Sequence, residues 1–437
     1  MIVTTQEISS YFERLFPITR SITGAGNRQT LLILQEIIPL KILEYPSGKK
    51  VYDWDIPLEW NIRNAWIKND KGEKIIDYLK CNLHILNYSV PINKVMNFFE
   101  LKEHLYFLCE QPDVIPYKTS YYKRNWGFCL TYNDYLELFN ENEEYEVFID
   151  SELKQGYLTL ADYVIEGHGD QEFIFSTYFC HPSLANDNLS GILACAFLAR
   201  EISGMKLRNT YRFIFCPETI GTITYIAEHA GIFKGIKGGY ILTCLAGPGQ
   251  FGYKQSYLGN SLVDRAVYLA FKEKGIVFIN YPFIPQGSDE RQYSSPGLRI
   301  PIGSIHKDKY HEYKEYHTSA DNLDFVSSES LLTGIQFYLS IIENLESDIR
   351  FISRKPICEP KLDKYGLYPN IGRRFIWNQR TINNIESHND LDIILWLLFY
   401  ADGEHSLLEI AEKHGFNLSY MKKILFKLSK KGLIKIL

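Results

Sequence analysis

A histidine and an aspartate stand close together in a polar segment near the middle of the chain. The stretch EFIFSTYFCHPSLANDNLSG covers residues 172–191 and places His181 six residues before Asp187. A neutral imidazole and a carboxylate are both good zinc ligands, and a carboxylate can also bridge two metals. The alternative is a surface loop in which Asp187 or Asn188 caps the helix that follows. The pair alone leaves both interpretations open.

The flanking residues predict how this loop is positioned. Residues 173–179 form an apolar run that is typical of a buried strand, and a helix is expected to begin near Ser190. In an open α/β sheet, ligands bind beyond the carboxyl ends of the central strands, which is where this loop would lie. The strand would hold the loop rigidly, while the loop turns both side chains toward one point.

Two later segments carry residues that fit the same chemistry. Glu218 follows the apolar run 210–216, and a carboxylate there could act as a general base or simply favour a helix N-terminus. His317 lies in a polar loop, and Asp321 is close enough in sequence to orient it. A metal-activated hydrolase needs a few such ligands, an open coordination position and a carboxylate base.

The wider pattern predicts an α/β domain around these residues. Apolar runs alternate with helical patterns; the runs cover residues 173–179, 210–216 and 239–245, and the helices 191–202, 220–230, 261–274 and 327–345. Such alternation is typical of a mostly parallel sheet covered by helices on both faces. We therefore expect a catalytic domain over residues 151–350.

The N-terminal third has a different character. Residues 1–42 predict two helices that pack on the catalytic core, and Arg20 in the loop between them is expected to be solvated rather than part of a site. Residues 43–150 have turn signals between short runs rich in Trp, Ile, Val and Tyr, which predicts a β-rich inserted domain. Within it, the aromatic and basic stretch 117–129 could line a cleft, although an edge strand is the favoured interpretation.

The C-terminal segment differs again. We expect a linker over residues 351–383 and a winged-helix domain over 384–437, because three short helical patterns are followed by a short apolar strand. Residues 406–437 hold seven lysines and two glutamates, so this part is locally basic. Since its third helix carries lysines but no arginine, a structural or dimerising role is favoured over DNA binding.

The composition limits the classes of protein that fit. A chain of 437 residues is too long for one ordinary core, and a net charge of −5 gives no global reason to expect nucleic acid. Its eight cysteines form no C-x-x-C pair, so we expect reduced, buried thiols in a cytoplasmic protein. Cys180 beside His181 could be a ligand or nucleophile, but a core position is favoured. No signal peptide or membrane span is expected.

Three short segments, in this order, resemble a known superfamily. CHPSLANDNLSG, PETIG and YHTSAD are similar to the H…DNxSG, E-E-x-G and H-T-x-x-D segments of the zinc aminopeptidases related to bacterial leucyl aminopeptidase and glutamate carboxypeptidase. WGFC, GSDERQY and the C-terminal winged helix resemble, more narrowly, an aminopeptidase-like family with a β-rich insertion, sometimes labelled as linked to polysaccharide biosynthesis. This resemblance covers nearly the whole chain and implies a zinc-exopeptidase fold.

The resemblance also implies roles for individual residues. The residues it marks as metal ligands are His181, Asp187 and His317, with Asp187 the potential bridge and Glu218 the general base. It further implies a cis peptide bond between Asp187 and Asn188. The loop GSDERQY is expected to bind substrate; its charged residues are Asp289, Glu290 and Arg291, of which the two carboxylates could instead complete the metal site.

Two departures from the superfamily pattern bear on the number of metals. The position after the base holds Thr219 instead of a second glutamate, and residues 245–249 contain no carboxylate where an acidic ligand is expected. We therefore expect one zinc ion and not a complete two-zinc site. If the alignment shifts by one residue, Glu218 becomes a ligand and no base remains, but the position of Gly221 favours the base.

These expectations define one leading function and its alternatives. The leading one is a zinc-dependent aminopeptidase-like hydrolase that removes N-terminal residues from peptides, with Glu218 activating a metal-bound water. The alternative is a catalytically degenerate metal-binding protein with a regulatory or polysaccharide-biosynthesis role that acts through its winged helix. An amidase or deacylase on the same scaffold is a third. The expected partner is a peptide or small amide, and no membrane is expected. Binding to nucleic acid stays open but is not favoured, and a homo-oligomer also stays open.

Overall fold

The computed structural model describes residues 3–368 and 390–437, which form two compact units. The N-terminal unit comprises Met1–Ser261 and Val277–Gln336, and the C-terminal unit comprises Leu262–Ile276 and Phe337–Leu437. Part of the predicted linker 351–383 lies outside the described residues. The finer division into five segments stays a prediction.

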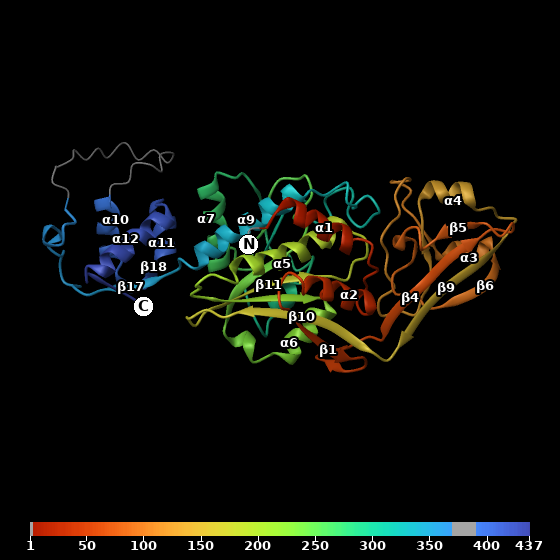
Figure 1. Cartoon of the computed structure of the whole chain (residues 1–437), viewed down its shortest axis with the longest axis horizontal. Coiled ribbons are helices and arrows are strands. Elements are labelled where there is room, and N and C mark those ends of the chain that lie inside the picture. Colours follow the sequence, from red (N-terminus) through yellow and green to blue (C-terminus); the bar gives the residue numbers. More distant parts are fainter. Residues whose placement is uncertain (1–2, 369–389) are drawn as a thin grey trace. The chain divides into compact units, whose positions relative to one another are not determined.

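An eight-stranded sheet forms the core of the N-terminal unit (Figure 1). Its strands, in spatial order, are β1 (Lys41–Pro46), β10 (Tyr157–Ile165), β12 (Thr210–Cys216), β11 (Glu172–Tyr178), β13 (Ile236–Leu242), β16 (Ile302–His306), β14 (Gly252–Lys254) and β15 (Ile279–Tyr281). The pairs that β11 makes with β12 and β13 are parallel, as is the pair of β13 with β16. β10 and β14 join the sheet antiparallel, at β12 and β16. The predicted α/β class is confirmed.

Buried helices follow the central strands. α5 (Gly191–Ile202) packs against β11 and β12, and ten of its residues are buried, which matches its broad apolar surface. α6 (Ile220–Glu228) begins directly after β12. The remaining short elements of this region are η3 (Ala185–Ser190), η4 (Ile232–Lys234) and α8 (Glu290–Tyr293). The junctions of β11 with α5 and of β12 with α6 thus fall at the edge of the sheet where these parallel strands end.

The first helices and the insertion complete the N-terminal unit. α1 (Thr5–Leu15) is capped by the Thr4 hydroxyl, and α2 (Ala25–Leu34) follows, so the two predicted helices are present. A hairpin of β2 (Lys50–Val51) and β3 (Trp54–Asp55) comes after β1. The insertion then forms a four-stranded sheet of β5 (Lys74–Asp77), β4 (Glu59–Lys68), β9 (Glu144–Lys154) and β6 (Ile92–Asn97). Its smaller elements are η1 (Asn82–His84), α3 (Phe98–Leu101), η2 (Lys102–His104), β7 (Leu105–Tyr106), β8 (Phe128–Cys129) and α4 (Tyr132–Leu138).

The C-terminal unit contains the winged helix. Its elements are α7 (Leu262–Lys274), the C-terminal part of α9 (Ser328–Leu345), β17 (Arg350–Ser353), η5 (Leu362–Tyr365), α10 (Asp390–Phe399), β18 (Asp402–Ser406), α11 (Leu407–His414), α12 (Leu418–Lys430) and β19 (Ile434–Ile436). β17 pairs with both β18 and β19, so the wing is a three-stranded sheet. The side chains of Ser406 and Asn417 cap α11 and α12. The predicted winged helix is confirmed.

Two further features are the absence of a membrane-spanning helix in the described residues and the state of the cysteines. No helix within residues 3–368 and 390–437 is long and apolar enough to cross a membrane. All eight cysteines are free thiols, and five of them are buried.

The packing of α12 generates a stability prediction. Leu425 is fully buried in the C-terminal unit, whereas the side chain of its neighbour Phe426 is 42% exposed. We expect Leu425→Ala to lower the free energy of unfolding of this unit by about 2–5 kcal/mol, because it leaves a cavity. Phe426→Ala should cost less than about 1 kcal/mol. Thermal and denaturant unfolding of both variants checks this, and equal losses would contradict the described packing.

Candidate metal centre

Three predicted ligands converge at the carboxyl end of β11. The ligand atoms of His181, Asp187 and His317 all lie within 4.8 Å of one another, although the residues come from two loops far apart in sequence. His317 Nε2 is 3.0 Å from Asp187 Oδ2, and the two imidazole centroids are 5.2 Å apart. The structure therefore brings together the set that the sequence singled out.

Asp187 is an ionised carboxylate in the interior. Its side chain is 1% exposed, and the Tyr178 hydroxyl donates a 2.5 Å hydrogen bond to Oδ1. Burial by itself raises the pKa of Asp187, but His181, His317 and the Tyr178 hydroxyl together lower it to about 2. The peptide bond from Asp187 to Asn188 is cis, as the resemblance implied.

The side chain of Asp321 holds the loop that carries Asp187. Its two carboxylate oxygens accept hydrogen bonds from the backbone N–H groups of Asn186 (2.6 Å) and Asp187 (2.9 Å). The Tyr313 hydroxyl donates to the same carboxylate at 3.0 Å. The sequence predicted that Asp321 would orient His317; it instead orients the loop of the other ligand, because the fold places its carboxylate under the backbone at 186–187.

Arg20 holds the loop of His181, which corrects the expectation that this arginine is solvated. The side chain is fully buried, and its Nε donates to the His181 carbonyl at 2.8 Å while Nη1 donates to the Leu15 carbonyl at 2.7 Å. Burial lowers the pKa of Arg20 to about 10, so it stays charged at neutral pH. Burial also lowers the pKa of His181 to about 4, which keeps the imidazole neutral and able to bind a metal.

Glu218 stands beside the three ligands at the end of the adjacent strand. One carboxylate oxygen lies within 4.8 Å of a His181 nitrogen and the Cys180 sulfur, and the side chain keeps partial exposure to solvent. Burial, with the negative charges of Asp289 and Asp187, raises the pKa of Glu218 well above its usual range. Cys180 itself is buried and accepts from the Glu218 backbone N–H at 3.4 Å, which agrees with the favoured core position.

The inserted segment supplies one wall of the site. The Tyr117 ring lies 5.0 Å from the His181 ring and 5.1 Å from the His317 ring, and its backbone N–H donates to the His317 carbonyl at 2.7 Å. The favoured interpretation of residues 117–129 as an ordinary edge strand is therefore wrong for Tyr117. Neither Tyr117 nor Tyr178 was predicted as part of the site, because an aromatic side chain in a strand-like run carries no signal beyond that of a core.

The loop GSDERQY reaches the neighbourhood of Glu218. Asp289 accepts a 2.8 Å hydrogen bond from the Thr219 backbone N–H, and burial raises its pKa to about 6. Arg291 donates to the Thr219 hydroxyl at 3.4 Å. Glu290 turns elsewhere, with its carboxylate 3.6 Å from the buried Lys254 ammonium. Of the three predicted substrate-binding residues, two thus contact the residue next to Glu218.

The donor set fits a zinc ion. Two neutral imidazoles and one carboxylate are ligands that zinc prefers, and three protein ligands leave a position open for chemistry. His317 Nε2 is buried and has no aligned hydrogen-bond partner among the described residues, although Asp187 is close. An imidazole nitrogen and a carboxylate oxygen that face the same point without bonding each other are arranged as ligands would be.

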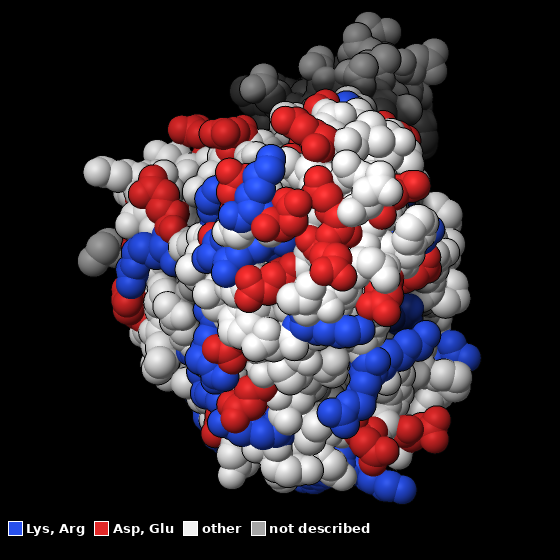
Figure 2. All heavy atoms as spheres, turned by 90° about the vertical axis from the view of Figure 1, so that its right-hand side faces the viewer, with Lys and Arg blue, Asp and Glu red and all other residues white. Residues whose placement is uncertain are grey.

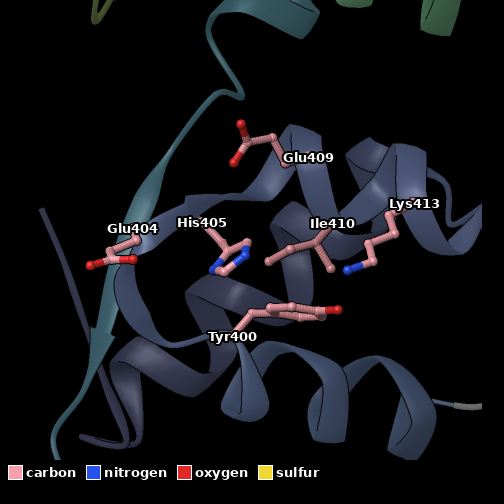
Figure 3. A pocket seen from close by; sticks show the side chains of 6 residues that line it. All are labelled: Tyr400, Glu404, His405, Glu409, Ile410 and Lys413. Atoms are coloured by element: carbon pink, nitrogen blue, oxygen red, sulfur yellow. The ribbon is translucent and has the colours of Figure 1, made fainter.

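A hollow in the C-terminal unit offers a different set of groups (Figure 3). It measures about 250 Å³, and it is lined by Tyr400, Glu404, His405, Glu409, Ile410 and Lys413. His405 Nδ1 is 2.7 Å from Asp402 Oδ2, and Glu409 accepts from the backbone N–H of Ser406 and from Arg265. With these groups partnered and a lysine ammonium at its edge, this hollow does not compete with the centre at β11 as a metal site.

The chain matches two known families. Residues 9–348 match a family described as a domain of unknown function (DUF4910). The chain belongs to this family. Residues 350–436 match a winged helix-turn-helix family. A protein of Clostridium acetobutylicum, named as a polysaccharide biosynthesis protein with an aminopeptidase-like domain, is 42% identical over 419 residues, which is 96% of this chain and 94% of that protein.

Solved structures share the fold. A crystal structure from C. acetobutylicum described as a peptidase superposes with a TM-score of 0.89 at 40% identity, over 99% of this chain and 96% of that chain. BSAP, a zinc aminopeptidase from Bacillus subtilis, gives a TM-score of 0.55 at 13% identity, over 78% of this chain and 95% of that chain. The resemblance to zinc aminopeptidases is confirmed at the level of the fold.

The centre generates a metal-binding prediction. We expect His181→Ala and His317→Ala each to lose stoichiometric zinc, because each removes one of three ligands. His168→Ala and His229→Ala should retain it, since these imidazoles contact the Leu207 carbonyl and the Tyr45 hydroxyl. Metal analysis of the purified variants checks this. Full occupancy in His317→Ala would overturn the one-metal assignment.

The support beneath the centre generates a second prediction. Asp321→Asn keeps the size of the side chain but replaces one of its two acceptor oxygens with an NH2 group. That group then faces a backbone N–H and cannot accept its hydrogen bond. We expect zinc affinity to fall by about 10- to 100-fold, which is typical of groups that orient a ligand. The exposed Asp324→Asn is the matched control. Competition with a chromophoric chelator measures the zinc affinity of both variants. If Asp321→Asn binds zinc as tightly as the parent, the loop positions Asp187 without the Asp321 carboxylate.

Proposed function

We propose that the protein is a zinc-dependent aminopeptidase-like hydrolase that removes N-terminal residues from peptides. The observation that carries the proposal is the convergence of His181, Asp187 and His317 beside the carboxylate of Glu218. A zinc ion on these three ligands would supply a Lewis acid that polarises the carbonyl under attack and acidifies water.

Glu218 takes the part of the general base in this proposal. A partly exposed carboxylate within 4.8 Å of a His181 nitrogen can accept a proton from the attacking water and return it to the leaving amine. Its raised pKa makes it a better base than an ordinary glutamate, and a cation nearby would keep it ionised in the resting state.

The loop beside Glu218 is suited to hold the substrate's amino terminus. Asp289 is buried. Its carboxylate accepts a 2.8 Å hydrogen bond from the Thr219 backbone N–H, which is a neutral donor and not a cationic side chain. We assign Asp289 to the ammonium group and Arg291 to a polar group of the substrate. Glu290 is assigned a supporting role, because its carboxylate neutralises Lys254.

The alternative is a protein that binds metal without catalysis. Thr219 replaces an acidic ligand and residues 245–249 offer no carboxylate, so the site would hold one ion where the superfamily pattern holds two. The similar protein named for polysaccharide biosynthesis fits such a role. An action of the winged helix on nucleic acid is not favoured, since Lys422, Lys427 and Lys431 contact partners within their own unit. On the face of the insertion, which Figure 2 shows, basic and acidic side chains are interspersed, so this face does not favour nucleic acid either.

One substitution distinguishes an enzyme from a protein that binds metal without catalysis. We expect Glu218→Gln to lower the peptidase rate by about 100- to 10,000-fold with zinc content unchanged, because the amide keeps the size of the side chain but cannot accept a proton. If Glu218 is a ligand instead, zinc affinity falls together with the rate. Zinc content and hydrolysis of unblocked dipeptides are measured on the same samples.

The matched control is Glu329→Gln, an exposed glutamate in α9. It should change neither quantity. Equal rates in an active parent and Glu218→Gln would refute the mechanism. If the parent shows no zinc-dependent hydrolysis of any unblocked peptide, the alternative of metal binding without catalysis is favoured.

A further inference from the structure

A second group of metal-ligating side chains lies next to the first, at the carboxyl ends of β11 and β12. Its members are the Cys180 thiol, one nitrogen of His181 and one carboxylate oxygen of Glu218, all within 4.8 Å of one another. Within residues 3–368 and 390–437, the one other group of three such donors is that of His181, Asp187 and His317. The proposed mechanism uses Glu218 as a base and gives Cys180 no part.

His181 belongs to both groups. Its Nδ1 lies 3.7 Å from the Cys180 sulfur. An imidazole has two nitrogens, and either one can bind a metal. Two positions for an ion therefore adjoin at this imidazole, one beside Asp187 and His317 and the other beside Cys180 and Glu218.

The sulfur and the carboxylate of the second group come from residues that contact each other. Cys180 is 1% exposed, and its sulfur accepts a 3.4 Å hydrogen bond from the Glu218 backbone N–H. The Glu218 side chain stays partly exposed, so an ion can reach this position from solvent. A thiolate and a carboxylate are both ligands that zinc prefers, and a thiol releases its proton when a metal binds.

The charges around Glu218 favour a further cation. The negative charges of Asp289 and Asp187 act on its carboxylate, and the positive charge of Arg291 opposes them. An ion bound to Glu218 would relieve the repulsion between these carboxylates. Two dications on adjoining groups nevertheless repel each other, and the thiol has a proton to lose. The second position should therefore fill only after the first.

We propose that Cys180 and Glu218 form an inhibitory metal position beside the first ion. Zinc in excess of one equivalent binds there to the Cys180 sulfur and a Glu218 oxygen, and it shares the His181 imidazole with the first position. The thiol proton passes to solvent. Because Glu218 is then a ligand, it no longer accepts a proton from the attacking water, and hydrolysis stops. The inhibition rests on the proposed hydrolase function, whereas the metal position does not.

Cobalt is the probe for the position, because its absorption reports the ligands. A thiolate bound to cobalt gives an intense charge-transfer band in the near ultraviolet, which imidazole and carboxylate ligands do not give. The metal-free full chain is titrated with cobalt chloride. We expect no such band with the first equivalent and its appearance with the second, which should bind at least about tenfold more weakly.

Two cysteine variants locate the sulfur. Cys180→Ser should bind the first cobalt equivalent, which shows that its centre is folded, and should lack the band. The matched control is Cys244→Ser. Cys244 is also buried and its sulfur lies 3.9 Å from Asp187 Oδ1, but it belongs to neither group of three donors, so the band should persist. If Cys180→Ser does not bind the first equivalent, Glu218→Gln replaces it and should bind the second at least about tenfold more weakly.

Inhibition is measured on the zinc-loaded chain with an unblocked dipeptide. We expect excess zinc to lower the rate at least about tenfold relative to one equivalent, because the base is lost. In Cys180→Ser, the zinc concentration at half inhibition should rise at least about tenfold, since one ligand is missing. Each chain is compared with its own rate at one equivalent, so a change in the basal rate does not enter the comparison.

The outcomes separate this inference from the proposed function. The position is overturned if the parent shows no band in excess cobalt, if the band is complete at the first equivalent, or if it survives in Cys180→Ser. If the band behaves as expected but excess zinc leaves the rate of an active parent unchanged, the inhibitory role is wrong. A parent that hydrolyses no peptide refutes the proposed function, and the cobalt titration still decides whether the position exists.

Discussion

The ionised carboxylate of Asp187 is the constraint on which the centre depends. A charge withdrawn from water costs several kcal/mol unless partners replace the solvent. The Tyr178 hydroxyl supplies one hydrogen bond, and His317 approaches the other oxygen without bonding it. A second carboxylate, that of Asp321, fixes the backbone at Asn186 and Asp187. Two buried acidic side chains therefore meet at one loop. The carboxylate and the two imidazoles are gathered as the ligands of a cation would be.

The backbone around this centre is strained at the loops that frame it. Thr219, Cys244 and His317 have φ values of 64°, 52° and 55°, in a region that side chains with a Cβ rarely adopt, least of all a β-branched one. Such residues persist only where the surroundings determine them, and they gather at functional sites. The loop at 245–247 is held by the Asn186 side chain, which accepts from two of its backbone N–H groups. That loop therefore contributes backbone N–H donors to this region and no carboxylate.

The elements of the core could be predicted because their signals are local. The strand 210–216 and the helix 191–202 have the predicted bounds, since a continuous apolar run and a broad apolar face depend on adjacent residues alone. The ligand set followed from motifs at strand ends. Arg20 and Tyr117 could not be placed, because what decides their roles is a partner about 160 and 200 residues away. A buried, charged arginine in particular contradicts the usual preference of that side chain for solvent.

The insertion is part of the centre and not an appendage to the fold. Besides the bond from Tyr117 to the His317 carbonyl, the Ser319 backbone N–H donates to the Ile115 carbonyl, and the Ser319 hydroxyl accepts from the Ile115 N–H. These bonds join a segment of the insertion to the loop of the candidate ligand His317, as in two paired strands. Because these bonds help to hold His317 at its positive φ, a displacement of the insertion would move its imidazole relative to Asp187. The inserted segment thus helps to position the candidate ligand His317.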